Sequence, residues 1–189
     1  MKAIRILSMA VILCILGNTQ ILQAQDKTVS YNNEIRFGAF QLLNNMFYIS
    51  YEHLYSNFGT SFTTVLIYKD TYDESVTGYM VQLDQKIYLK NVSTDYGSIY
   101  FSPGIKYRYK EFKGSTYTDK LNTYGIQLVG GIKYVIYNRL VIDFYLGGKI
   151  NNTIINKTDD SDTMYDKNLF SPGFSGILPV INCTFGFQF

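Results

Sequence analysis

The sequence is poor in several residue types that mark common classes of protein. Its 189 residues include no tryptophan, one histidine, two cysteines and three prolines, and only 17% of them are charged. A disordered chain would be rich in charge and poor in aromatic residues, whereas aromatic residues here reach 16%. The low charge content also argues against a charge-laced helical bundle. The length corresponds to one domain.

The first 24 residues have the pattern of a cleaved secretory signal peptide. Lys2 and Arg5 form a positive segment, residues 6–16 are apolar, and Ala24 is the small residue before the expected cleavage site. The apolar segment is shorter than the roughly 20 residues of a membrane helix. Cleavage would remove two of the 17 basic residues and none of the 15 acidic ones, so residues 25–189 would carry no net charge. This mature domain is therefore not expected to bind nucleic acid.

The mature chain repeats a single pattern, in which apolar residues alternate with polar or small ones. A period of two is the signature of a β-strand with two different faces. In the last segment, Ile181, Phe185 and Phe189 belong to an apolar face, and Asn182 and Gln188 belong to the opposite face. Eight such segments are expected as strands: 34–42, 47–55, 59–68, 78–89, 98–111, 122–136, 139–150 and 177–189.

These segments predict an all-β fold, an eight-stranded antiparallel up-and-down transmembrane β-barrel. Inside a bilayer the backbone polar groups must pair within the protein, which only helices and closed sheets achieve. No apolar run after residue 24 approaches the length of a membrane helix. A secreted soluble barrel or sandwich would explain the alternation equally well, but it explains less well the entirely apolar face of 177–189. The long connections near 113–120 and 151–176 are expected on the outer side of the membrane, where Leu43–Met46 is unexpectedly short.

The face opposite the apolar one carries charged residues, which we expect to point into the barrel. Eight strands enclose an interior that side chains fill, and isolated charges there would be costly. The strand of Asp84 and Lys86 precedes that of Lys106 and Arg108, so cross-strand ion pairs are available. As an alternative, Lys106, Arg108 and Lys110 could form an anion site. We predict a plugged interior with a polar network of Arg36, Glu52, Asp84, Lys86, Lys106, Arg108, Lys133 and Asp143.

No arrangement of residues in the sequence indicates a catalytic, metal or cofactor site, and we expect a protein that is not an enzyme. His53 is the only histidine, and Ser56, three residues later, would not share its strand face. Cys183 alone remains after cleavage, so neither an internal disulfide nor a cysteine-rich zinc site is expected. Three clustered acidic residues lack the glycine and the distal glutamate of a calcium-binding loop and indicate a solvated loop instead: Asp159, Asp160 and Asp162.

The last eight residues complete a resemblance to a known family. Together with the signal peptide and the alternating segments, they are similar to small bacterial outer-membrane barrels of the OmpX and OmpA-barrel kind. In that family the barrel-assembly machinery reads an aromatic residue at the end of the last strand. The resemblance therefore implies an assembly signal formed by Asn182, Phe187 and Phe189, although Thr184 stands where that signal prefers glycine. The composition, rich in Tyr, Asn and Lys, resembles that of Bacteroidetes proteins.

The resemblance implies a location in the cell outer membrane, surrounded by lipid and lipopolysaccharide, without a cofactor; we expect a monomer. Three functions remain open. The first is a structural or surface-display barrel with a plugged interior. The alternative is a narrow channel for ions or small solutes. The third is a lipid-modifying barrel enzyme, which would need His53.

Overall fold

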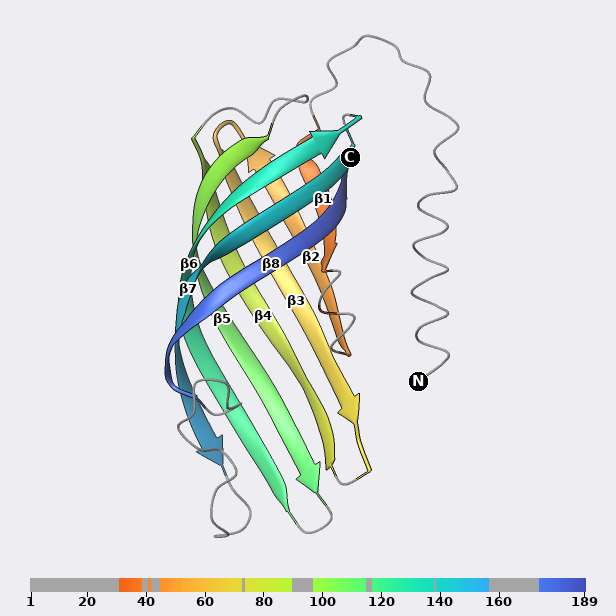
Figure 1. The fold of residues 1–189 in the computed structure, drawn as a ribbon, viewed down its shortest axis with the longest axis vertical. Coiled ribbons are helices and arrows are strands. Elements are labelled where there is room, and N and C mark those ends of the chain that lie inside the picture. The colour runs from red at the N-terminus through yellow and green to blue at the C-terminus, as the bar shows by residue number, and fades with distance from the viewer. Residues whose placement is uncertain are drawn as a thin grey trace. The chain divides into compact units, whose positions relative to one another are not determined.

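The chain forms a closed barrel of eight antiparallel strands (Figure 1). The computed structural model describes residues 31–38, 41, 45–72, 74–89, 97–114, 117–137, 139–156 and 174–189, so the predicted signal peptide lies outside the described residues. Each strand pairs with the next, and β8 pairs with β1 to close the sheet, which confirms the predicted fold class. The strands are β1 (Asn33–Gly38), β2 (Met46–Tyr55), β3 (Phe58–Asp70), β4 (Glu74–Tyr88), β5 (Ser98–Gly114), β6 (Thr118–Ile136), β7 (Leu140–Asn156) and β8 (Gly176–Gln188).

Several strands extend further than the alternation of apolar residues predicted. For example, β6 has 19 residues and begins at Thr118, where the pattern indicated a start at residue 122. The added residues carry exposed polar side chains such as Lys113, Lys120 and Asn156, which interrupt the apolar face. The ladder of hydrogen bonds continues regardless, because backbone amides still require partners. In contrast, the structure describes β1 only as Asn33–Gly38, and residues 39, 40 and 42 of the predicted segment lie outside the described residues.

The two ends of the barrel differ in how far the strands extend beyond the predicted segments. At the end that is uppermost in Figure 1, β2 joins β3 through Ser56–Asn57, and β6 is followed by a turn at Tyr137. Ser56 and Tyr137 have positive φ angles of 54° and 51°, as tight reversals of direction often require. The C-terminal Phe189 lies at this end, which we call the short-turn end. We call the opposite end the long-strand end, because the extended parts of β4 to β7 lie there.

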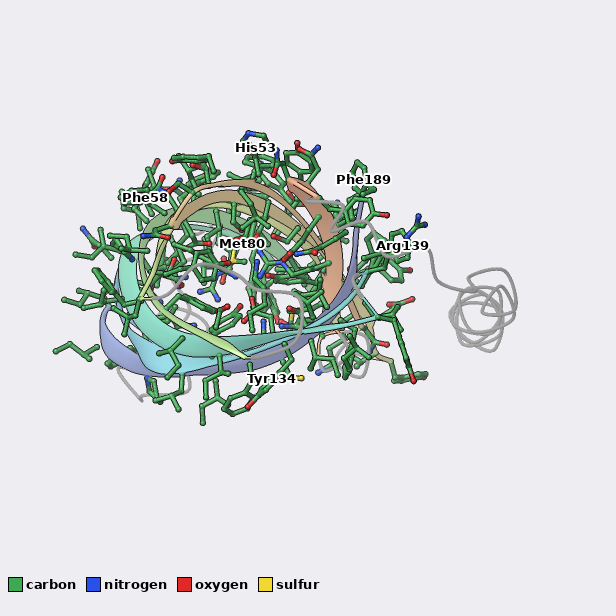
Figure 2. The ribbon with its side chains drawn as sticks, turned by 90° about the horizontal axis from the view of Figure 1, so that it is seen from above. His53, Phe58, Met80, Tyr134, Arg139 and Phe189 are labelled. Carbon is green, nitrogen blue, oxygen red and sulfur yellow. The ribbon has the colours of Figure 1, made fainter. Side chains whose placement is uncertain are left out.

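Side chains alternate between the two faces of the sheet, and the apolar rows point outward. On β6, Ile126 and Leu128 are exposed, whereas Lys133 is completely buried. Figure 2 shows the same division, with Phe58 outside the ring of strands and Met80 within it. Among the described residues, no helix is long and apolar enough to cross a bilayer.

Candidate functional site

A network of charged side chains lies in the interior of the barrel. It contains three cations and three carboxylates from five strands, and none of them is more than 4% exposed. Charges can be buried in this way when they are paired with opposite charges, whereas an isolated buried charge is strongly destabilising. Because its charges cancel, we call this set the balanced network: Glu34, Arg36, Glu52, Lys86, Lys133 and Asp143.

Arg36 contacts all three carboxylates of the balanced network. Its Nε lies 2.9 Å from Glu34, its Nη2 lies 2.8 Å from Glu52, and its Nη1 pairs with Asp143. The Nη2 atom also donates a hydrogen bond to the hydroxyl of Ser61, at 3.1 Å. A guanidinium group suits this position because it presents several donors in one rigid plane. One side chain thus connects β1, β2, β3 and β7 across the interior.

Two lysines complete the balanced network. The Nζ atom of Lys86 lies 3.0 Å from Glu52 and 2.5 Å from Asp143. The Nζ atom of Lys133 lies 3.0 Å from Glu34 and 3.1 Å from Glu52. Every carboxylate therefore contacts at least two cations, and the loss of any one member would leave a buried charge incompletely compensated.

Two buried tyrosines donate hydrogen bonds to the balanced network. The hydroxyl of Tyr88 lies 2.5 Å from Glu52, and that of Tyr100 lies 2.6 Å from Asp143. Gly131 is the residue opposite Tyr100 on β6, and a β-carbon there would overlap the tyrosine ring. The glycine therefore provides the space that lets this ring reach the network.

Asp84 does not form the predicted ion pairs with Lys106 and Arg108. Its carboxylate instead accepts hydrogen bonds from Gln82 at 2.6 Å and from Gln127 at 2.9 Å, and among the described residues no salt bridge joins it to either cation. The register explains the difference, because Gly104 is the residue opposite Asp84. The carboxylate occupies the space over that glycine, where a β-carbon would overlap it.

A second set of charged side chains faces the interior toward the long-strand end and consists of cations, although the carboxylate of Asp119 is also buried at that end. Lys106 is 8% exposed, and its ammonium group is a neighbour of that of Lys149. Arg108 donates a hydrogen bond to Thr123 at 3.4 Å. The prediction omitted Lys149, although by alternation it shares the strand face of Asp143. We call this set the basic group: Lys106, Arg108, Lys110 and Lys149.

The interior is not polar throughout, so the predicted polar lumen was incomplete. Toward the long-strand end, a buried apolar cluster includes Tyr48, Val65, Phe112 and Leu121. Val65 belongs to a segment whose two faces cannot be told apart in the sequence, because both are rich in β-forming residues. Phe112 and Leu121 lie just beyond the predicted ends of their strands. The period-two pattern therefore could not assign these side chains to the interior.

The three residues of the implied assembly signal lie on both faces of the last strand. Asn182 points inward, and its Nδ2 donates a hydrogen bond to the hydroxyl of Tyr145 at 2.6 Å. Phe187 and Phe189 are exposed on the outside. Only the two aromatic residues are therefore displayed on the surface of the folded barrel.

His53 lies on the outer face near the short-turn end (Figure 2). Its Nδ1 is 2.9 Å from Oδ1 of Asn33, and its ring stacks on Tyr55. Ser56 lies in the β2–β3 turn rather than beside it on the strand. In the parts of the chain that the structure describes, no three His, Cys, Asp or Glu side chains could hold a metal ion together. The acidic residues at 159, 160 and 162 fall outside those parts.

Comparison with protein-family models and with curated proteins found no match for this chain. A barrel fold alone does not define a function, because the same fold supports many activities. Three features of the described residues bear on function: the apolar outer face, the balanced network and the basic group.

Proposed function

We propose that this protein is an integral β-barrel of the bacterial outer membrane, exported by a signal peptide at residues 1–24, with a closed interior and a structural or surface-display role. One observation carries the proposal. The barrel is apolar on the outside and ionic on the inside, which is the reverse of a soluble protein. A barrel in lipid has this arrangement, because its outer face contacts acyl chains.

The outer face supports insertion in lipid through the extent of its apolar surface. Ile126 is 58% exposed, Leu128 is 60% exposed and Ile181 is 73% exposed, and similar residues continue along every neighbouring strand. A soluble monomer rarely exposes a continuous apolar patch larger than a few hundred Å². Exposure of this apolar surface to water would be energetically unfavourable, whereas the acyl chains of a bilayer would cover it.

The spacing of aromatic residues along β6 indicates that the height of the apolar band matches the thickness of a bilayer. Tyr124 and Tyr134 face outward ten residues apart, with apolar outward side chains between them. At a rise of about 3.4 Å per residue and a strand tilt of about 40°, this interval spans about 26 Å along the barrel axis. The apolar band of outer-membrane barrels is about 25 Å tall and is bordered by aromatic residues at both interfaces.

Aromatic neighbours extend both borders to other strands. Toward the long-strand end, the ring of Tyr107 lies 5.1 Å from that of Tyr124 and 6.0 Å from that of Tyr79, measured between centroids. Toward the short-turn end, Tyr55 stacks on Phe58 at 5.9 Å. Tyrosine suits such positions because its ring and its hydroxyl face different media.

The balanced network supports a closed interior rather than a channel. Its ion pairs connect five strands, and its members are almost inaccessible to water. A permeating ion would have to separate these pairs in a region of low dielectric constant. We therefore expect the purified protein to produce no steady unit current in planar lipid bilayers, and a reproducible unit conductance would favour the narrow channel.

The membrane proposal is tested by extraction and gel mobility. The protein should remain in the outer-membrane fraction after carbonate washing, dissolve in detergent with a β-type far-UV dichroism spectrum, and migrate differently on gels before and after boiling. A heat-denatured sample run without refolding is the control for the shifted band. Recovery of the processed chain as a dissolved monomer without detergent would contradict the proposal.

The environment of His53 supports a structural role for this residue. Its partner is the amide of Asn33 rather than a carboxylate, and Ser56 lies off the strand, in the turn. His53→Ala should therefore leave both the folded fraction and the lipid A composition of expressing cells unchanged. Mass spectrometry of extracted lipid A checks this result, with an empty-vector strain as control. A modification that requires the protein and disappears in His53→Ala would favour the enzyme.

A further inference from the structure

The barrel interior contains an unpartnered polar side chain next to the basic group. Asn151 on β7 is only 3% exposed, and neither its amide nitrogen nor its amide oxygen has a hydrogen-bond partner among the described residues. A buried amide without partners is destabilising relative to a satisfied one. Such a group is retained most readily where a ligand supplies the missing hydrogen bonds.

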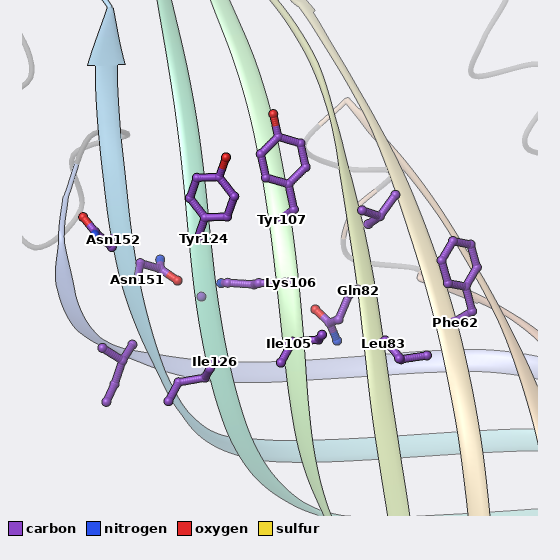
Figure 3. Close-up of a pocket in the computed structure, with 13 residues that line it drawn as sticks. Phe62, Gln82, Leu83, Ile105, Lys106, Tyr107, Tyr124, Ile126, Asn151 and Asn152 are labelled. Atoms are coloured by element: carbon purple, nitrogen blue, oxygen red, sulfur yellow. The ribbon is translucent and has the colours of Figure 1, made fainter.

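Asn151 and Lys106 reach over the same residue from opposite sides. Gly125 on β6 is paired with Lys106 on β5 and with Asn151 on β7. A β-carbon on Gly125 would lie 2.7 Å from Cε of Lys106 and 2.6 Å from Oδ1 of Asn151. Figure 3 shows the two side chains directed toward each other across β6. The absence of a side chain at Gly125 thus brings a cation and an amide together.

The positive charge around this point exceeds the negative charge. Lys149 neighbours Lys106, and in the described parts of the chain neither lysine takes part in a salt bridge. The carboxylate of Asp84 acts on Lys106, but both of its oxygens already accept hydrogen bonds, from Gln82 and Gln127. Repulsion between buried like charges would be relieved by a bound anion.

We propose that Lys106, Lys149 and Asn151 form a binding site for a small oxyanion of the phosphate or sulfate class inside the barrel. The two ammonium groups supply charge, and the amide nitrogen of Asn151 supplies an oriented donor. The neighbouring guanidinium of Arg108 adds a planar set of donors that matches such oxyanions. Lys106 and Asn151 are buried on the inward face, so we assign a free anion as the ligand, and a lipid headgroup is an outcome that the test distinguishes. This inference goes beyond the proposed structural role and does not depend on it.

The test is calorimetric titration of the purified protein, in a non-ionic phosphate-free detergent, with inorganic phosphate at constant ionic strength. We expect saturable binding of one phosphate per barrel, competition by sulfate and none by chloride. Lys106→Met/Lys149→Met should weaken binding at least tenfold, whereas Lys113→Gln, which changes an exposed lysine on the same strand as Lys106, should not. Absence of saturable binding, or equal binding by the double variant, would overturn the proposal.

The variant Asn151→Asp tests whether phosphate binding can be lost while the protein remains folded. The new carboxylate would act as an internal counter-ion, so this variant should lose phosphate binding while its unfolding temperature rises above that of the unliganded wild type. Retained phosphate affinity in this variant would contradict the site. Adding micelles of a short-chain anionic phospholipid should not displace phosphate, and displacement would instead assign the site to a lipid headgroup. The difference in gel mobility between boiled and unboiled samples confirms that each variant is folded.

Discussion

The balanced network and the basic group lie in one barrel and contain similar side chains. They differ in whether the buried cations are compensated by carboxylates. In the balanced network, Arg36, Lys86 and Lys133 each contact at least two carboxylates. In the basic group, Lys106 and Lys149 neighbour each other. The first arrangement stabilises the closed barrel through internal pairs. The second leaves charge that a ligand can compensate. We therefore expect the balanced network to contribute to stability and the basic group to contribute to anion binding.

The largest expected effect comes from breaking the balanced network at Arg36. Arg36→Met would leave three buried carboxylates with only two lysines, and we expect the free energy of unfolding to fall by about 3–5 kcal/mol. Urea titration in lipid vesicles, followed by the gel mobility of unboiled samples, measures the change. Lys113→Gln is the control for a charge change at an exposed position. A loss below about 1 kcal/mol would show that the network does not hold the barrel together.

A smaller effect is expected from the tyrosine that supports the network. Tyr100→Phe keeps the ring packed over Gly131 but removes the hydrogen bond to Asp143. Because this bond is made to a charged acceptor, the free energy of unfolding should fall by about 1.5–3 kcal/mol. The same urea titration measures it. An unchanged midpoint would indicate that water replaces the hydroxyl without cost.

Asp84 lies between the two regions. A substitution there tests whether its carboxylate stabilises the barrel through hydrogen bonds or through ion pairs. In Asp84→Asn one oxygen acceptor becomes a donor, so one of the two bonds from Gln82 and Gln127 is lost. We expect the free energy of unfolding to fall by about 1–2 kcal/mol, with little dependence on salt. A much larger loss at low salt than at high salt would favour the ion pairs predicted from the sequence.

The smallest effect is expected in the basic group. Lys106→Met removes one of two neighbouring cations without breaking a salt bridge, so its stability should lie within about 1 kcal/mol of wild type or above it. It is the matched counterpart of Arg36→Met, because a buried cation becomes the same apolar residue in both. Equal destabilisation by the two variants would contradict the claim that the balanced network stabilises the barrel and the basic group does not. Parallel urea titrations at the same phosphate concentration make the comparison.

A strand could be predicted from the sequence only over the residues where one of its faces is apolar. The pattern located eight strands and assigned Lys106 to the face opposite Ile105. It failed where the outward residues become polar, as at Lys120, because the apolar outer face and the backbone pairing end at different points.

The partners of the interior residues could not be predicted, because alternation assigns a face without assigning a register. The neighbours Asp84 and Lys106 were expected to pair, but β4 and β5 align Asp84 with Gly104 instead. Asp143 meets Arg36 across 107 positions of sequence, which only closure between β8 and β1 brings about. The alignment of Asn151 with Gly125, and of Lys149 with Gln127, likewise follows from the register of β7 against β6 and not from alternation.

The sequence by itself determined the strand content, the two faces and the inversion of polarity, since all three follow from the order of residue types at a period of two. The tertiary structure decided which charges cancel and which do not. That distinction depends on closure and register, which bring side chains within a few ångströms of one another, and electrostatic energy in a low-dielectric interior depends on such distances. Two groups of charged residues that look alike along the chain thereby acquire opposite consequences for stability and binding.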